Sequence, residues 1–217
     1  MTRFFIADTH FAHGSKSSTA QGGIIKMMAR VRPDGQLFSC QEEHDLHLID
    51  QINARCGHDD ELIIVGDFAF DKPGKYRQMI DCRCRLVLGN HDRKEKSANV
   101  FGEIPEIIRT AAYNEKRSDH IKLFVSHYPT MYWDGSHRGW GHLYGHTHAQ
   151  REEYLDTLEP QRRALDVGVD NIYRLFGEYR PISEHEVYDY LGRRSGHDDI
   201  RFYKDYQKEL YSNRGLI

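Results

Sequence analysis

Short apolar runs, each followed by a cluster of polar and small residues, are the dominant pattern along this chain of 217 residues. Runs that are rich in aliphatic and aromatic residues and bounded by turn residues are typical of buried strands. Five segments show the pattern and are predicted to be strands: 3–7, 61–65, 85–88, 122–126 and 164–169. The last of them is expected to extend to Asp170 as one of the final strands of the fold.

Three other segments carry apolar residues at helical spacing. The S-x-x-E spacing of a helix capping box occurs at Ser39 with Glu42 and again at Ser183 with Glu186. A helix with one apolar face is predicted after each box. The third segment is the tail 199–211, whose apolar side chains share one face: Ile200, Tyr203, Tyr206 and Leu210.

The composition indicates one globular domain. A hydrophobic fraction of 39% with 29% charged residues is typical of a folded chain rather than a disordered one. The length suits a single domain, and neither an internal repeat nor a linker divides the sequence. We therefore predict one domain over 1–217, with a core of about 1–180 and a C-terminal helical extension over 181–217. The small, polar segment 14–23 is expected to be a surface loop.

Charge and cysteine usage narrow the class of protein. The 30 basic and 33 acidic residues give a net charge of −3 without a block of one sign, which disfavours a tightly held nucleic acid but leaves nucleic acid open as a substrate. The four cysteines form no C-x-x-C pair, which fits a reduced cytoplasm. No apolar run is long enough for a membrane span, and the first run is interrupted at Asp8. A cytoplasmic protein with no membrane partner is expected.

Metal-binding residue types stand directly after four of the predicted strands. The segments in question are Asp8-Thr9-His10, Gly66-Asp67, Gly89-Asn90-His91-Asp92 and His127. Ligands of α/β sheets bind outside the carboxyl ends of the strands, so these side chains are expected to meet. Further along, His146 and His148 are two residues apart and present two imidazoles to one side of an extended segment. With 14 histidines, the chain has more of them than tyrosines or phenylalanines.

Each of these pieces has an ordinary structural reading when taken alone. Asp67 is also a suitable helix cap, Gly89-Asn90 is a turn signal, and an isolated His127 is more often a hydrogen-bonded interior histidine than a ligand. The ordered set D-x-H, G-D, G-N-H-D, H and G-H-x-H favours a dinuclear metal site instead. Two metals about 3.5 to 4 Å apart supply a nucleophile and neutralise phosphoryl charge, and one carboxylate must bridge them.

The ordered set resembles the calcineurin-like metallophosphoesterase superfamily, and in particular its small single-domain bacterial and phage members. The resemblance covers the chain from Arg3 to about Asp170. It implies an α/β (α+β) fold in which two β-sheets pack face to face with helices outside, a four-layer sandwich with metals at the strand ends. The phrases that carry it are Asp8-Thr9-His10-Phe11-Ala12-His13, Gly66-Asp67-Phe68-Ala69-Phe70, Ser126-His127-Tyr128-Pro129 and Gly145-His146-Thr147-His148.

The resemblance also implies a role for each motif residue. Asp67 would bridge two divalent ions, and a bridging hydroxide would attack the phosphate ester while His91 acts as general acid and Asp92 orients it. Manganese is the expected metal, and iron, zinc, nickel and cobalt suit the same donors. The implied ligands are Asp8, His10 and His148 for the first metal and Asn90, His127 and His146 for the second.

Substrate contacts are expected from the loop between His127 and His146, which holds both tryptophans. Aromatic side chains there would stack on a planar leaving group, although packing of the loop is an equal alternative. The candidate substrate residues are His13, Arg93, Trp133, His137 and Arg138.

The function predicted from the sequence is a metal-dependent phosphodiesterase or nucleotide phosphatase that acts on a small phosphate ester. A protein phosphatase is disfavoured, because members of the superfamily that act on proteins carry an aspartate and an arginine where this chain has Phe68-Ala69-Phe70. Two alternatives stay open: a nuclease acting on DNA or RNA ends, which needs a basic groove, and a catalytically silent metal-binding or interaction protein. The intact His91 argues against the silent protein.

Overall fold

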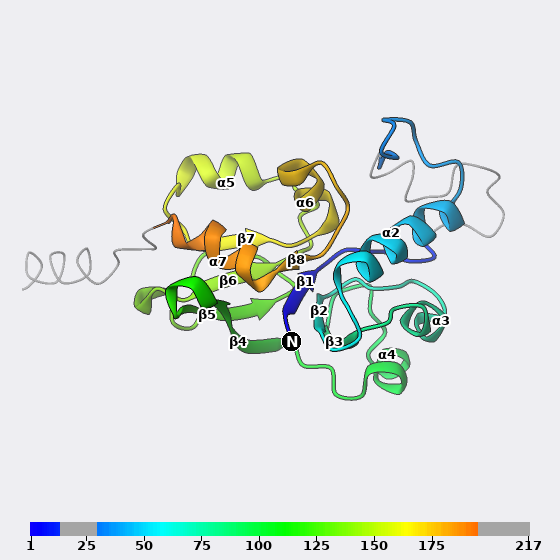
Figure 1. Ribbon diagram of the computed structural model, residues 1–217, viewed down its shortest axis with the longest axis horizontal. Coiled ribbons are helices and arrows are strands. Elements are labelled where there is room, and N and C mark those ends of the chain that lie inside the picture. The colour runs from blue at the N-terminus through cyan, green and yellow to red at the C-terminus, as the bar shows by residue number, and fades with distance from the viewer. Residues whose placement is uncertain (14–29, 195–217) are drawn as a thin grey trace, which may run out of the picture.

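The computed structural model describes residues 1–13 and 30–194. The predicted surface loop 14–23 and the predicted tail helix 199–211 lie outside the described residues. Within them, two four-stranded sheets are flanked by six helices, which confirms the predicted two-sheet α/β sandwich (Figure 1). None of the helices in the described ranges has the length and apolarity that crossing a membrane requires.

The first sheet has the order β3-β2-β1-β8. Strands β1 (Arg3–Ile6), β2 (Glu61–Val65) and β3 (Arg83–Val87) are parallel, and β8 (Ile182–Ser183) pairs antiparallel with β1. Because β8 is part of this sheet, the described residues just after Pro181 belong to the core rather than to an appended segment. Helix α7 (Glu184–Gly192) buries Val187 and Leu191 against both sheets.

The second sheet has the order β4-β5-β6-β7. Strands β5 (Asp119–Ser126), β6 (Gly141–Tyr144) and β7 (Ala164–Asp166) are parallel, and β4 (Ile107–Asn114) pairs antiparallel with β5. Four of the five predicted strands thus have shifted boundaries, and β4, β6 and β8 were not predicted. The strand predicted to extend to Asp170 ends at Asp166. The last residues of the predicted strand form the start of helix α6 (Val169–Phe176) instead.

The strand side chains alternate between two apolar layers. Phe5, Ile63 and Val65 of the first sheet face Leu123 and Val125 of the second and form the core between the sheets. The opposite face of the first sheet packs on helix α2 (Gln41–Arg55), whose buried residues recur at helical spacing. This period-two alternation determines which side chains point into the core between the sheets, and it thereby fixes the pairing register within each sheet.

The remaining helices connect the strands and cover the outer faces. Helices α3 (Pro73–Gln78) and α4 (Lys94–Phe101) lie beside α2 at the first sheet, and α5 (Glu152–Leu158) lies with α6 at the second (Figure 1). Two short 3₁₀ turns, η1 (Glu115–Arg117) and η2 (Ser136–Arg138), lie in loops.

The two predicted capping boxes have different outcomes. At α7 the box is present, since the Glu186 amide donates to Ser183 Oγ and the Glu186 carboxylate accepts from the Ser183 amide at 2.9 Å. At α2 the prediction was wrong. The N-cap is Cys40, and the amide and hydroxyl of Ser39 both bind the carboxylate of Glu43 rather than Glu42.

Candidate metal centre

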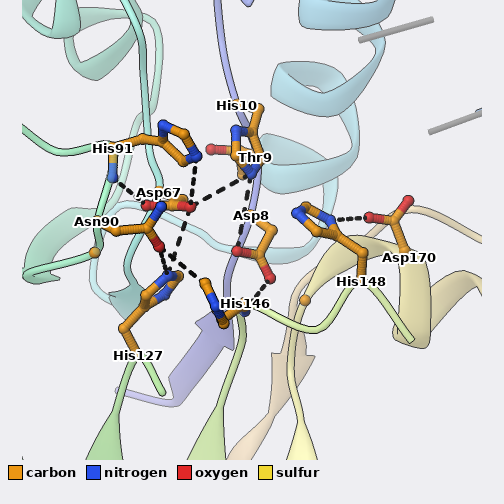
Figure 2. A network of polar contacts seen from close by, with 12 residues as sticks. Asp8, Thr9, His10, Asp67, Asn90, His91, His127, His146, His148 and Asp170 are labelled. Atoms are coloured by element: carbon orange, nitrogen blue, oxygen red, sulfur yellow. Dashed lines mark hydrogen bonds and ion pairs between the residues drawn. The ribbon is translucent and has the colours of Figure 1, made fainter. Parts of the chain in front are cut away.

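The predicted ligands meet where the parallel strands of both sheets end. The ends of β1, β2 and β3 supply Asp8, His10, Asp67 and Asn90, and the ends of β5 and β6 supply the remaining histidines (Figure 2). Parallel strands leave their carboxyl ends at one edge of a sheet, and face-to-face packing brings the two edges together. Segments as distant in the chain as Asp8 and His146 therefore touch, with the Asp8 carboxylate accepting from the His146 amide at 2.9 Å.

The first group of candidate ligands consists of Asp8, His10 and His148, whose ligand atoms lie within 4.8 Å of one another. Asp8 and His10 are almost fully buried, yet Oδ1 of Asp8 and both ring nitrogens of His10 have no hydrogen-bond partner among the described residues. Buried polar atoms are nearly always paired, because an unpaired one loses the hydrogen bonds it made to water. Asp8 Oδ1 and His10 Nε2 lie 3.9 Å apart, and an unpaired carboxylate oxygen beside an unpaired imidazole nitrogen suits a divalent cation.

The second group consists of Asp67, His127 and His146, again with ligand atoms within 4.8 Å. Asn90 joins this group, because its Oδ1 lies 3.0 Å from His127 Nε2 and 2.9 Å from His146 Nδ1. His127 Nδ1 faces the Val65 carbonyl at 2.9 Å and donates to it, which leaves Nε2 directed at the group. The exposed His146 and Asn90 make this group the more open of the two.

Asp67 lies between the two groups. Its Oδ2 is 3.6 Å from His10 Nε2 and 3.5 Å from His127 Nε2, so one carboxylate faces ligands of both sets. Burial opposes its ionisation, but the hydrogen bond and charge of His127 outweigh burial and lower the pKa of Asp67 to about 2. The carboxylate is therefore ionised at neutral pH.

Asp8 has the opposite tendency. Burial and the negative charges of Asp166, Asp67 and Asp170 raise the pKa of Asp8 well above its usual range. Burial and the charge of Arg30 lower the pKa of His10 to about 2, so its imidazole is neutral and able to ligate. Closely spaced carboxylates beside neutral imidazoles favour a bound cation, because a cation reduces the repulsion between the carboxylates.

The backbone of the site is strained in a consistent way. Five of the candidate ligands have left-handed backbone conformations, which are uncommon outside glycine: Asp8, His10, Asp67, His146 and His148, with φ between 49° and 71°. Strain of this kind costs about 1 to 3 kcal/mol per residue and clusters at functional sites. The surrounding hydrogen bonds therefore hold these turns against their intrinsic preference.

Two glycines leave the room that the site needs. A Cβ on Gly66 would lie 2.2 Å from His127 Nδ1, and one on Gly89 would lie 2.3 Å from Asp67 Oδ1. Gly66 also has φ +88°, which favours glycine independently of space. A side chain at either glycine would therefore clash with a candidate ligand, which explains why glycine precedes Asp67 and Asn90.

His91 reaches the outer side of the site. Its amide donates to Asp67 Oδ1 at 2.9 Å, and its Nε2 lies 4.0 Å from Asp67 Oδ2. The side chain is 45% exposed, unlike the buried ligands beside it. Its position beside both groups and open to solvent fits a residue that exchanges a proton with a bound substrate.

The Asp92 side chain points toward backbone amides and not, as predicted, toward the His91 ring. Its carboxylate accepts from the amides of Asp67, Phe68 and Gly89 at 2.8 to 3.0 Å, so the expectation that it orients the His91 ring is wrong. The side chain turns inward and is buried, since it satisfies the amides of two turns whose strands have ended. Asp92 therefore fixes the backbone of the bridging Asp67.

His13 lies at the rim of the site. Its ring stacks on Phe70 at 3.8 Å between centroids with an interplanar angle of 5°, and Phe70 lies 4.7 Å from the His91 ring. The expectation for His13 is compatible with this position. Phe70 itself was not predicted, although the phrase Asp67-Phe68-Ala69-Phe70 contained it.

The other predicted substrate residues lie elsewhere. Trp133 is buried in its own loop and donates from Nε1 to the Trp140 carbonyl at 2.9 Å, so the packing alternative describes it. Arg138 is an exposed partner of Asp134, His137 is exposed in η2, and Arg93 is the exposed N-cap of α4. From the same loop, Tyr128 instead packs 4.8 Å from the His146 ring.

Sequence reasoning missed two charged residues beside the first group. Asp170 accepts from His148 Nδ1 at 2.8 Å, and the fully buried Arg30 holds Asp170 through both carboxylate oxygens (Figure 2 shows the Asp170 contact). Both contacts join segments far apart in the chain, so no local spacing reveals them. The one signal in the sequence was Asp170 itself, an acidic residue shortly after the end of β7 at Asp166.

Known proteins resemble this chain without revealing a function. No family model matches it. An uncharacterized protein of Methanocaldococcus jannaschii is 26% identical over 185 residues, covering 83% of this chain and 85% of that protein. The gene 66 protein of Mycobacterium phage D29 is 26% identical over 157 residues, covering 59% and 76%.

A solved structure supports the fold. A protein of unknown function from Aquifex aeolicus superposes with a TM-score of 0.58 at 23% sequence identity, covering 86% of this chain and 97% of that one. The two-sheet architecture is thus one that another natural sequence also adopts.

Proposed function

We propose that this protein is a phosphoric ester hydrolase that works with two divalent cations. The observation that carries the proposal is the position of Asp67, whose Oδ2 lies 3.6 Å from His10 Nε2 and 3.5 Å from His127 Nε2. A bridging carboxylate between two sets of imidazole and oxygen donors is what a dinuclear site requires. The ordered motifs that resemble the metallophosphoesterases support the same conclusion.

The residues divide the chemical work between them. When bound, divalent cations supply positive charge at the phosphoryl oxygens and activate water for attack. Asp67 contributes a carboxylate that stays ionised, because its pKa lies at about 2. His91 has its imidazole at the solvent side and is the residue placed to give a proton to the leaving oxygen. The buried Asp8 and His10 exclude solvent from the inner side.

The rim favours an ester with a planar leaving group. Tyr128 beside His146 and the stacked pair of His13 and Phe70 present aromatic rings on two sides of the site. Nucleobases and aryl groups stack on such rings. We therefore propose a phosphodiester or a nucleotide as the substrate class, with manganese as the cofactor to test first.

Hydrolysis of a bis-aryl phosphate tests the proposal directly. Full-length protein stripped with EDTA should be inactive and should regain turnover with Mn²⁺, Co²⁺, Ni²⁺, Zn²⁺ or Fe²⁺. The panel also includes aryl monoesters, cyclic nucleotides and short DNA and RNA oligonucleotides. Activity restricted to the oligonucleotides would establish a nuclease instead. Cation binding without hydrolysis of any of these esters would contradict the proposal and favour a silent metal-binding protein.

A further inference from the structure

Arg30 is a fully buried cation beside the first ligand group, which is an unexpected place for a positive charge. It belongs to none of the motifs, and at 1% exposure it is among the largest completely buried side chains. A buried guanidinium is retained only where its charge and all its N–H groups are compensated.

Every donor of Arg30 has an acceptor. Nε and Nη2 bind the two carboxylate oxygens of Asp170 at 2.8 Å each, in the bidentate arrangement that suits a guanidinium. The second hydrogen of Nη2 goes to the Asp8 carbonyl at 2.7 Å. Nη1 donates to the Thr9 carbonyl at 3.3 Å and to His44 Nε2 at 3.0 Å. All five N–H groups are thereby used.

The contact with Asp170 extends to the ligand His148. Both carboxylate oxygens of Asp170 accept hydrogen bonds from the guanidinium of Arg30, which fixes this carboxylate in place as an acceptor. His148 Nδ1, 2.8 Å away, must therefore carry the hydrogen of that bond. This fixes the ring orientation and leaves the lone pair of Nε2 free for a cation, as second ligand shells do in other metal sites.

The contacts with the carbonyls extend to the ligands Asp8 and His10. Both residues have left-handed backbone conformations, with φ of 57° and 50°. Arg30 binds the two carbonyls, of Asp8 and Thr9, that lie between these strained positions. It therefore stabilises the turn that directs the two side chains inward.

His44 continues the network to the far end of the same turn. Because arginine only donates, His44 Nε2 is the acceptor, and Nδ1 then donates to Asp45 Oδ1 at 3.1 Å. Asp45 Oδ2 in turn accepts from the Ala12 amide at 3.0 Å. The turn from Asp8 to Ala12 is thus bound at both ends.

We propose that Arg30 is the positioning residue of the first metal group: its fork joins Asp170 to the Asp8–Thr9 turn and thereby sets Asp8, His10 and His148 together. The inference rests on the metal centre of the proposed function. Arg30 acts through the geometry of its planar guanidinium, so another positively charged side chain at this position would not replace it. The second group, Asp67 with Asn90, His127 and His146, does not depend on this residue.

Mn²⁺ binding to the full chain, measured by calorimetry and electron paramagnetic resonance, tests the proposal. Two variants allow the two ligand groups to be measured separately. H146A removes a ligand of the second group, and H148A removes a ligand of the first group. R30M should lower Mn²⁺ affinity by roughly 10- to 100-fold in the H146A background and leave it unchanged in the H148A background. R32M is the matched control, since Arg32 forms surface ion pairs with Asp34 and Glu43.

R30K separates geometry from charge, because lysine keeps the charge but lacks the planar fork. It should lose affinity as R30M does, and wild-type affinity in R30K would overturn the proposal. Equal weakening of both groups by R30M would also overturn it, as a sign of a general structural role. If R30M does not fold when stripped of metal, as judged by circular dichroism, D170N breaks the same fork and should show the same selective loss.

The metal assay also separates this inference from the function on which it rests. A wild-type chain that binds no divalent cation would contradict the proposed function itself. A wild-type chain that binds two, with R30M binding both at unchanged affinity, would contradict only the assignment of Arg30.

Discussion

At the scale of single residues, His91 and Asp92 show how neighbours in sequence take different tasks. One turns outward with its imidazole 45% exposed, and the other turns inward to bind three amides. The exposed imidazole is the one that a substrate can reach, so the proposed proton transfer is assigned to His91, whereas Asp92 stabilises the backbone of the turn.

Replacing His91 should affect turnover and leave the cations bound. We expect H91A to lose about 10²- to 10⁴-fold in kcat on a bis-aryl phosphate, the usual contribution of a general acid. Metal content by mass spectrometry should stay at the wild-type value, because the His91 side chain is not needed to complete either ligand group. H58A, at an exposed loop histidine, is the control. Unchanged turnover in H91A would remove the general acid from the mechanism.

Replacing Asp92 should act on stability first. Asn keeps the shape of the side chain but offers one carbonyl oxygen where the carboxylate accepts from Asp67, Phe68 and Gly89. We expect D92N to lower the free energy of unfolding by about 1 to 3 kcal/mol in urea. D59N, at an exposed aspartate, should have no measurable effect. A D92N protein of unchanged stability would contradict this account of the turn.

At the scale of elements, the turns after the strands decide whether the ligands can meet. Gly66 and Gly35 form a matched pair, since their φ values are +88° and +81° and an added Cβ is strained at both. At Gly66 that Cβ would lie 2.2 Å from His127, whereas at Gly35 nothing lies within 4 Å. The pair separates backbone strain from loss of space.

We expect G35A to cost about 1 kcal/mol of stability, the price of a left-handed alanine. G66A should cost more and should also displace His127, so that Mn²⁺ binding weakens in calorimetry while G35A binds normally. Equal metal affinities in the two variants would show that the site tolerates a shift of the β2 turn.

What the sequence could predict follows the range of the interactions involved. The strand ends and their ligands are local, because an apolar run and the motif after it stand together in the chain, and the capping box of α7 spans four residues. The structure confirms the two-sheet fold and brings the candidate ligands together. Arg30 was missed because its partners Asp8 and Asp170 are 22 and 140 positions away.

The wrong assignments have a similar cause. The segment after Asp166 reads as an apolar strand, but Gly168 is the N-cap of helix α6, and its carbonyl accepts hydrogen bonds from the Asn171 and Ile172 amides. β6 was missed because Gly141-His142-Leu143-Tyr144 is short and buried on both faces, so alternation is absent. Pairing with β5 and β7 decides its conformation, and pairing is not visible in a single segment.

At the scale of the whole molecule, the two sheets bring several buried carboxyl groups to one place. Asp8, Asp67, Asp166 and Asp170 repel one another there, and Arg30 is the buried cation that faces them. Burial and the charge of Glu152 raise the pKa of Asp166 to about 6. The metal-free fold therefore carries an electrostatic cost that depends on pH.

The sign of that dependence follows from proton binding. Between about pH 4 and 6 the unfolded chain releases the Asp166 proton while the folded chain keeps it, so Asp166 lowers stability as pH rises and its cost is complete above pH 6. Removing the charge of Asp166 should therefore raise the free energy of unfolding at neutral pH. In EDTA, we expect the unfolding free energy of D166N minus that of wild type to rise by on the order of 3 kcal/mol between pH 4 and 7, measured in urea.

Taking the difference between the two proteins isolates Asp166 from the buried histidines. His10 and His142 have lowered pKa values, so they lower the stability of the fold as pH falls and the unfolded chain takes up their protons. This slope is opposite to that of Asp166, but both histidines are present in both proteins. With excess Mn²⁺ the rise should shrink, because a bound cation favours the ionised carboxylates. A rise that is equal with and without Mn²⁺ would mean that the carboxylates at this end of the sheets do not share a cation.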